Sequence, residues 1–437
     1  MPTGVLGKGE TYFRFNRSFG WMHPVVAPNP SLLPLDRHAQ ADWDAVVVGG
    51  GLVGLCTAYA LRLTNPEARI LLLEKESGVA QHQSGRNSGV VHSGLIYPRG
   101  SLKAKLCLRG KETLLNFCQN QGIQTRQFGK IFTATTRGEV EVLRKLEKRA
   151  QTHKIYSRYM SGRALKEVEP NVSAMAALHV PSVRCVDFSQ VARGVAERLI
   201  AHHVHLAFGE KIISLRTHRG LAQIKTQRRV ITARRVINCA GVYADTLARK
   251  SGLRLKGQIV PFKGIYYYLR KERRALVNGL IYPAPKPKVP FLGIHLTRTV
   301  HDEVHCGPNA VLALGKAAYA RGEIGLFDFC RMATFPGLYR MLRHHNKMVK
   351  QEFKRSISKR HFLNGVQNLV PAITEEDVLQ GFTGIRAQAM RADGTLVTDF
   401  WFESNGPFFH VLNAPSPAAT ASFAIGEAIA KKVGALT

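Results

Sequence analysis

The chain has 437 residues, of which 45% are hydrophobic and 21% are charged, so it can bury one or two sizeable cores. Wholesale disorder is excluded. Lysine and arginine outnumber aspartate and glutamate by 32, which favours anionic partners: phosphates, carboxylates, nucleic acid or an anionic membrane.

The seven cysteines are scattered and form no CxxC pair. Their spacing predicts neither a disulfide scaffold nor a zinc site, and we expect no metal. No run of about 18–20 apolar residues occurs, so we expect no membrane-spanning helix.

Residues 1–41 are predicted to be a mitochondrial presequence. They are basic, rich in aromatic residues and poor in acids, with only Glu10 and Asp36 before Asp42. Several prolines between residues 24 and 34 prevent a long helix. An ordinary N-terminal extension is the alternative.

A dinucleotide-binding motif follows. Residues 44–48 (DAVVV) read as a buried strand, residues 52–63 as a helix and residues 69–74 (RILLLE) as a second buried strand. Between them, Gly49 permits a tight turn, Gly51 permits close approach to a pyrophosphate, and Gly54 permits packing of helix on strand. Glu74 ends the second strand, where its carboxylate can accept hydrogen bonds from a ribose.

The segment after this unit favours FAD over NAD. Residues 78–100 form a polar loop, rich in glycine and serine, whose small donors can surround a second set of phosphates and a flavin ring. The predicted cofactor contacts from this region are Lys75, Gln83, Ser84, Asn87, Ser88 and Gly89.

Later elements are predicted from periodicity. Helices are expected at residues 102–121, 139–150, 189–202 and 416–432, and strands at 204–208, 229–239 and 260–269. Residues 381–389 and 395–402 are predicted as paired strands joined by an Asp393-Gly394 turn. Ser416 is expected to cap the last helix, with Pro417 in its first turn.

Two further segments are expected to contact the cofactor. One is the end of the strand at residues 229–239, with Ala240 and Gly241, because such strand ends face the ligand crevice of a doubly wound sheet. The other is the start of the last helix, where a helix N-terminus can face negative charge on a flavin. Its predicted contacts are Asn413, Ser416, Pro417 and Ala418.

Ten sequence blocks resemble the L-2-hydroxyglutarate dehydrogenase family, within the FAD-dependent D-amino-acid-oxidase-like superfamily. In chain order they are VVVGGGLVGL, LLEKE, HQSGRNSGVVHSGLIY, LKAKLCLRG, NCAGVYAD, VPFKG, PFLGIH, GPNAVLAL, GIRAQAM and NAPSPAAT, spanning about residues 42–435. The resemblance implies FAD-dependent oxidation of (S)-2-hydroxyglutarate to 2-oxoglutarate. It also implies a mitochondrial, inner-membrane-associated enzyme that passes electrons to a respiratory-chain acceptor, either a quinone or an electron-transfer flavoprotein.

Such an oxidation needs a base for the hydroxyl proton, and histidine is poised near neutral pH. His92 and His295 are the candidate bases, and either can instead be structural. Arg386 occupies the place where the superfamily commonly binds a substrate carboxylate, and its planar fork suits that group. Lys263 is the candidate for the second carboxylate, and Tyr97, Tyr266 and Asn309 are expected to line the pocket.

We therefore expect an α/β (α+β) fold with a Rossmann-like FAD-binding domain and a substrate domain built on a mixed or antiparallel sheet. The FAD-binding domain would comprise residues 42–97, 187–250 and 375–437, and the substrate domain residues 98–186 and 251–374. Residues 338–361 are basic and amphipathic, with Glu352 as their only acid. They suit an anionic membrane surface, or an apolar stripe that packs on its own domain.

Two other functions remain open from the sequence. An amino-acid or amine oxidase of the same superfamily would share the fold. A basic membrane-binding or nucleic-acid-binding protein on an inactive flavin fold would explain the charge, although no nucleic-acid signature occurs and we expect no such partner.

Overall fold

The computed structural model describes residues 41–285, 293–434 and 436. The predicted presequence therefore lies outside the described residues, apart from its last position, as do residues 290–292 of the PFLGIH block. No helix within the described ranges combines the length and the apolar character that crossing a membrane would require.

The first of two large sheets carries the predicted dinucleotide-binding unit. Among the described residues it has eight strands, and its centre is parallel, with β1 (Trp43–Val48) between β2 (Ile70–Leu73) and β12 (Val230–Asn238). The other strands are β9 (His205–Ala207), β10 (Ile212–His218), β11 (Leu221–Thr226), β19 (Trp401–Asn405) and β20 (Phe408–Asn413). The predicted order of buried strand, glycine turn, helix and buried strand is present.

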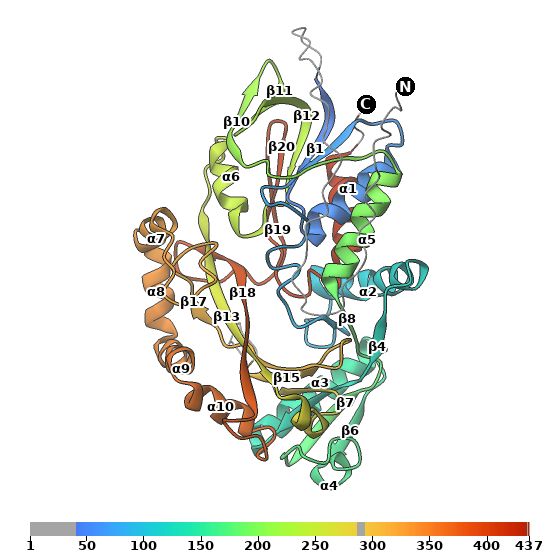
Figure 1. Ribbon diagram of the computed structural model, residues 1–437, viewed down its shortest axis with the longest axis vertical. Helices are drawn as coiled ribbons and strands as arrows, with labels where there is room; N and C mark the ends of the chain where they lie inside the picture. Colours follow the sequence, from blue (N-terminus) through green and yellow to red (C-terminus); the bar gives the residue numbers. More distant parts are fainter. Residues whose placement is uncertain (1–40, 286–292, 435, 437) are drawn as a thin grey trace, which may run out of the picture.

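Four helices cover one side of this sheet (Figure 1). They are α1 (Leu52–Thr64), α2 (Leu102–Asn120), α5 (Phe188–Ala201) and α11 (Ser422–Val433). Their buried side chains form one hydrophobic core with those of β1 and β2. The boundary expected at residue 97 would place α2 in the substrate domain. Instead, α2 packs against α11 in the core of the first half.

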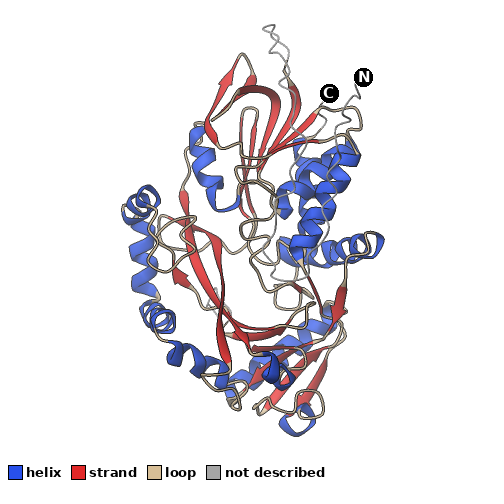
Figure 2. Ribbon diagram, in the orientation of Figure 1, coloured by secondary structure: helices blue, strands red, loops and turns tan. Residues whose placement is uncertain are grey.

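The second large sheet forms the other half and is mostly antiparallel (Figure 2). Its long strands β13 (Gly257–Leu269) and β18 (Val378–Arg391) pair from Gly257↔Arg391 to Leu269↔Val378. The remaining described strands are β5 (Lys130–Ala134), β6 (Arg158–Ser161), β7 (Ala176–Val180), β14 (Leu280–Pro283), β15 (His295–Arg298), β16 (Val304–Gly307) and β17 (Val311–Leu312).

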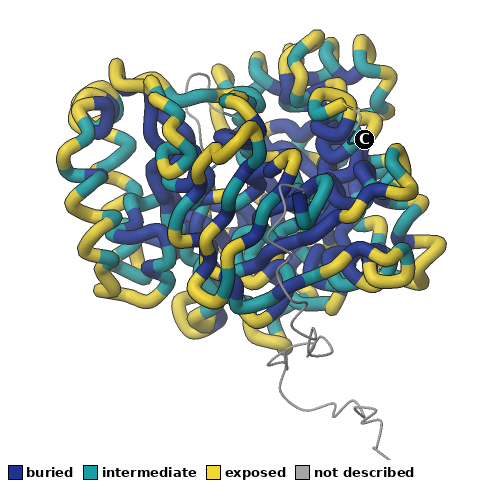
Figure 3. Tube along the Cα trace, turned by 90° about the horizontal axis from the view of Figure 1, so that it is seen from above, coloured by how far each residue is buried: buried dark blue, intermediate teal, exposed yellow. Residues whose placement is uncertain are grey.

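Smaller elements connect and cover these sheets. A short sheet contains β3 (Val90–Val91), β8 (Arg184–Val186) and β4 (Thr125–Gln127). The other helices are α3 (Arg137–Thr152), α4 (Gly162–Leu165), α6 (Ala244–Lys250), α7 (Leu326–Ala333), α8 (Pro336–His344), α9 (Asn346–Ile357) and α10 (Lys359–Gln367), with short 3₁₀ turns at Gly241–Tyr243 and Lys271–Leu276. Figure 3 shows buried segments of the chain in the interior and exposed segments around the outside.

Two expectations about elements are wrong. Residues 381–389 belong to β18, whose long partner is β13, and β19 pairs with β20. The two segments predicted to pair meet only beside the Asp393-Gly394 turn, where Val397 N–H donates to the carbonyl of Ala389 next to a Met390–Leu396 bridge. The last helix begins at Ser422, after a series of turns, and its N-cap residue is Ala421. Ser416 and Pro417 are therefore neither its cap nor its first turn.

Candidate active site

Two motif positions accept only glycine. Gly49 has a φ of +113°, and a Cβ there would lie 2.6 Å from the carbonyl oxygen of Cys239. A Cβ on Gly54 would lie 1.9 Å from the carbonyl oxygen of Gly49. Because Gly49 and Gly54 have no side chain, the N-terminus of α1 can lie close to the ends of β1 and β12. A doubly wound sheet binds its ligand at such strand ends.

A cavity of about 530 Å³ opens at this point and extends to the second sheet. Most of the predicted cofactor contacts line it: Gly49, Gly51, Glu74, Lys75, Gln83, Ser84, Asn87, Ser88, Ala240, Gly241, Ser416, Pro417 and Ala418. A Cβ on Gly51 would lie 3.0 Å from Ser84 Oγ, so glycine keeps this cradle open. A glycine cradle at a helix N-terminus fits a pyrophosphate, and the elongated cavity fits a dinucleotide.

Three predicted contacts do not line the cavity. Gly54 lies behind it, in the contact between helix and strand. Gly89 has a φ of +69° and lies against the carbonyl of Val186. The Asn413 amide joins β20 to the β18 region, since it accepts from Ala389 N–H and donates to the carbonyls of Val397 and Asp399.

The polar loop is held in place by its own hydrogen bonds. Ser84 Oγ accepts from Leu52 N–H at 2.9 Å, which ties the loop to the start of α1. Asn87 Nδ2 donates to the carbonyls of Gln83 and Ser84, and Asn87 Oδ1 accepts from Gly89 N–H. These bonds between protein groups hold the loop in the shape that forms the cavity wall.

Glu74 is also held by backbone groups, because its carboxylate accepts from Gly50 N–H at 2.6 Å and from Glu76 N–H at 2.9 Å. Beside it, His82 bonds Glu76 Oε1 at 2.7 Å and Tyr319 Oη at 2.6 Å. Burial and the nearby Lys75 ammonium lower the pKa of His82. This network links the loop of the first half to Tyr319 of the second.

The far end of the cavity contains both candidate bases. His92 follows β3, and its Nε2 lies 3.4 Å from Ser416 Oγ. His295 begins β15, and its Nδ1 lies 3.3 Å from Thr297 Oγ1. Its ring stacks on Tyr282 with centroids 3.9 Å apart.

Burial makes both imidazoles neutral in this site. It lowers the pKa of His92 to about 3, with a further contribution from the Lys130 ammonium. It lowers the pKa of His295 well below its usual value, aided by Lys130 and Arg386. A neutral imidazole accepts a proton, so either residue has the form that a base requires.

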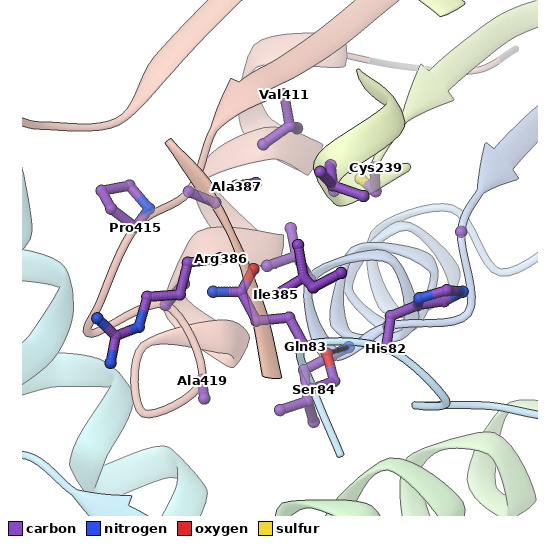
Figure 4. Close-up of a pocket in the computed structure, with 18 of the residues that line it drawn as sticks. His82, Gln83, Ser84, Cys239, Ile385, Arg386, Ala387, Val411, Pro415 and Ala419 are labelled. Carbon is purple, nitrogen blue, oxygen red and sulfur yellow. Dashed lines mark hydrogen bonds between the residues drawn. The ribbon is translucent and has the colours of Figure 1, made fainter. Parts of the chain in front are cut away.

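Two cations line the same region. Arg386 projects from β18, and Figure 4 shows it on the side of the cavity where Pro415 lies, away from His82 and Cys239. Lys103 enters from α2, and burial lowers its pKa to about 8. Among the described lining residues the only carboxylates, Glu74 and Glu210, come from the edge of the first sheet, so the far end is suited to anions.

Two of the residues expected to bind substrate lie elsewhere. Lys263 is outside the cavity lining, and its Nζ donates to the carbonyl of Ala320 at 2.7 Å. Asn309 is buried, and its Oδ1 accepts from Ile265 N–H at 2.9 Å. Lys263 and Tyr266 are three residues apart on β13, so alternation directs Lys263 away from the cavity that Tyr266 lines. Asn309 lies between β16 and β17 and binds the backbone of β13.

The two predicted tyrosines do line the cavity. Tyr97 Oη lies 3.4 Å from Ser416 Oγ, and Tyr266 Oη lies 3.1 Å from Ser88 Oγ. Sequence reasoning missed His82, Lys103, Tyr282 and Tyr319, which also line it. Lys103 and His82 lie in the quoted sequence blocks, but nothing local in the sequence marks Tyr282 or Tyr319.

No group of three or more histidine, cysteine, aspartate or glutamate side chains in the described part of the chain is arranged to hold a metal ion.

Comparison with known proteins gives matches over nearly the whole chain. Residues 44–432 match the family described as FAD dependent oxidoreductase. The L-2-hydroxyglutarate dehydrogenase of Indibacter alkaliphilus is 39% identical over 389 residues, covering 88% of this chain and 97% of that relative. The mitochondrial L-2-hydroxyglutarate dehydrogenase of Homo sapiens is 36% identical, covering 90% of this chain and 89% of the relative.

Solved structures share the fold at lower identity. The FAD-bound, dithionite-reduced L-α-glycerophosphate oxidase of Mycoplasma pneumoniae has a TM-score of 0.74 at 20% identity, covering 90% of this chain and 94% of that one. The glycine oxidase of Geobacillus kaustophilus has a TM-score of 0.66 at 16% identity, covering 90% and 95%. At these identities the likeness concerns the fold alone.

Proposed function

Because the chain belongs to the FAD-dependent oxidoreductases and, within them, to the L-2-hydroxyglutarate dehydrogenase family, we propose that it oxidises (S)-2-hydroxyglutarate to 2-oxoglutarate. FAD is its cofactor. The observation that supports this substrate is the far end of the cavity, where two cations and two neutral histidines face no carboxylate among the described lining residues. A dianionic hydroxy acid matches that set of groups.

When bound, FAD supplies the hydride acceptor. We propose that the glycine cradle and the α1 N-terminus hold its pyrophosphate and that Glu74 accepts from its ribose. Ser84, Asn87 and Ser88 would surround the flavin end, because their loop connects the cradle to His92.

For the substrate, we propose that Arg386 binds one carboxylate bidentately and Lys103 the other. The two side chains come from different elements, β18 and α2, so together they can hold a molecule that carries a charge at each end. Tyr97, Tyr266 and Tyr282 add apolar ring surface that excludes water and strengthens these charge interactions.

We propose His295 as the base that takes the hydroxyl proton. Thr297 engages its Nδ1, while its Nε2 makes no hydrogen bond with any described residue. By contrast, the Nε2 of His92 already lies beside Ser416 Oγ. His92 remains the alternative base, and His295→Ala and His92→Ala separate the two: the variant that lacks the base should lose turnover while it keeps flavin.

The direct test is anaerobic flavin absorbance of the purified protein, titrated separately with (S)- and (R)-2-hydroxyglutarate. Bleaching by the (S) form alone supports the proposal. A bound flavin that neither form bleaches contradicts the substrate assignment, and bleaching by amino acids would favour an amino-acid oxidase. Protein without flavin would favour the basic binding protein.

We further propose a mitochondrial location, with electrons passing to a respiratory-chain acceptor, a quinone or an electron-transfer flavoprotein. The basic leader and the mitochondrial names of the eukaryotic relatives support this location. Relatives of the same name also occur in bacteria, so import of a fusion of residues 1–41 to a reporter is the appropriate test.

Finally, we propose that the outer face of α7, α8 and α9, together with the start of α10, contacts an anionic membrane. This basic surface carries exposed Leu326, Phe327, Tyr339, Phe353 and Ile357 among exposed Arg343, Lys347, Lys350, Lys354 and Arg360. None of these five cations forms an ion pair with a described residue. Leu338 and Met341 of the predicted apolar stripe are buried against β18, so only part of the stripe is available to lipid.

A further inference from the structure

A second lysine lies beside the candidate active site, and nothing in the proposed function uses it. Lys130 begins β5 and is 3% exposed. Within the described residues its ammonium has no carboxylate partner. It lies instead 3.4 Å from the ring centroid of Tyr282 and 4.7 Å from that of Phe132.

Lys130, Tyr282 and His295 form a stack. The rings of Tyr282 and His295 are nearly parallel, at 11°, with centroids 3.9 Å apart. The Lys130 ammonium and the His295 ring both lie within 4 Å of the Tyr282 ring centroid. On the same face of that ring they would overlap, so they lie on opposite faces. The two stacking distances add to about 7 Å between the ammonium and the imidazole centroid.

A lone buried ammonium is costly, and contact with aromatic faces offsets only part of that cost. An apolar side chain would fill the same space against Phe132 and Tyr282 without the cost of burying a charge. A charge retained in such a place, next to a cavity with a neutral histidine, points to a role in the site.

We propose that Lys130 is a positioning residue that acts on His295 across Tyr282: its charge keeps the imidazole neutral and ready to accept the hydroxyl proton, without contact with the substrate. This inference rests on the proposed function, in which His295 Nε2 takes that proton.

The charges around His295 all act in the same direction. Tyr282 from β14 stacks on its ring. The groups close enough to lower its pKa by their charge are Lys130 from β5, Arg386 from β18, His305 from β16 and His92. None of them is acidic, so the imidazolium is disfavoured until a dianionic substrate arrives. Proton uptake by His295 is thereby coupled to occupancy of the site.

The test compares the holoenzyme with Lys130→Met, which keeps the length of the side chain and removes its charge. Without the cation the imidazolium is less disfavoured, so the acid limb of the kcat/KM profile should move to higher pH, by roughly one to two pH units for a charge about 7 Å away. KM on the plateau should be unchanged. Lys130→Arg should restore the original limb, and the exposed Lys271→Met should leave it unmoved.

A second measurement needs no substrate. Diethylpyrocarbonate acylates neutral imidazole, so the pH dependence of its reaction with His295, followed by peptide mass mapping, reports the same titration. The midpoint of this pH dependence should move to higher pH in Lys130→Met. If the methionine variant fails to bind flavin, Lys130→Gln takes its place in the comparison. This readout stays valid even if (S)-2-hydroxyglutarate proves not to be the substrate, in which case the parent enzyme shows no turnover.

Two outcomes would overturn the inference. Superimposable profiles of the parent and Lys130→Met, in both measurements, would show that the charge does not reach His295. A large rise in KM with an unmoved acid limb would show that Lys130 binds the substrate directly.

Discussion

Burial rather than ion pairing controls the charge of single residues around the cavity. It lowers the pKa of Lys130 to about 7 and that of His92 to about 3. A lysine whose folded-state pKa is depressed makes its full contribution to stability only above its usual pKa of 10.5. As the pH falls, that stability is lost, and the loss is complete below about 7.

Lys130→Met should therefore stabilise the protein, by about 1–4 kcal/mol near pH 7, as is common when a buried charge gives way to an apolar group. The difference from the parent should shrink as the pH rises from 7 toward 10.5. Urea unfolding of both proteins at several pH values measures it. A difference that does not change with pH would mean that the pKa of Lys130 is the same in the folded and unfolded states, and would contradict the lowered pKa.

Arg386 is expected to contribute to substrate binding rather than to cofactor binding. Loss of a charge-assisted hydrogen bond costs about 1.5–3 kcal/mol, so Arg386→Ala should raise KM for (S)-2-hydroxyglutarate roughly 100-fold while flavin content stays unchanged. Steady-state kinetics and the flavin-to-protein absorbance ratio test both parts. Arg386→Lys should recover only part of the affinity, because it lacks the planar fork, and an unaltered KM in the alanine variant would exclude the role.

At the scale of elements, the turn from β1 into α1 depends on close backbone contacts. The Cβ of Gly54→Ala would lie 1.9 Å from the Gly49 carbonyl oxygen, so α1 must move away from the sheet. We expect a loss of about 1–3 kcal/mol in stability, together with weaker flavin binding because the cradle opens.

Gly138→Ala on α3 is the matched control, since nothing lies within 4 Å of its added Cβ. This variant should keep flavin and gain slightly in stability, because alanine has a higher helix propensity than glycine. Flavin content and thermal unfolding of both variants measure the difference. Equal behaviour of the two would contradict the packing argument.

Among the helices and strands, some are predicted well by sequence patterns. Continuous apolar strands and glycine spacing predicted the unit from β1 to β2, because a buried parallel strand needs apolar residues on both faces. Residues 395–402 and 416–421 were predicted less well. A turn signal at Asp393-Gly394 cannot tell that β13 offers β18 a longer partner, and a serine and a proline are equally suited to turns and to helix starts.

At the scale of the whole molecule, nearby acidic residues do not neutralise the formal charge of +32 evenly. Acidic residues beside the basic surface are engaged internally: Glu352 accepts from Ala310 N–H and Arg355, and Asp328 accepts from Lys316 N–H. The cations of α8 and α9 therefore face outward without local compensation. Figure 1 shows these helices along one outer edge of the second sheet.

Charge reversal on this surface should release the protein from anionic vesicles. Each lysine near such a surface contributes about 1 kcal/mol, so the triple variant Lys347→Glu/Lys350→Glu/Lys354→Glu should bind cardiolipin-containing vesicles at least about 100-fold more weakly in a sedimentation assay. Arg137→Glu/Lys145→Glu/Lys148→Glu on α3 makes the same charge change elsewhere and should bind like the parent. Equal loss in both variants would indicate a diffuse charge effect without a dedicated surface.

The family, the FAD motif and most helices and central strands could be predicted from the sequence, because they depend on local spacing and on patterns of apolar residues. The sequence also predicted Arg386, His92 and His295 as candidates, and all three line one cavity. That Lys103 rather than Lys263 lines the cavity, and that Lys130 and His295 lie on either side of Tyr282, became visible only in the folded molecule. These relations join strands and helices that are distant in the chain, and the direction of a side chain at such a junction follows from strand pairing and packing, which local sequence does not encode.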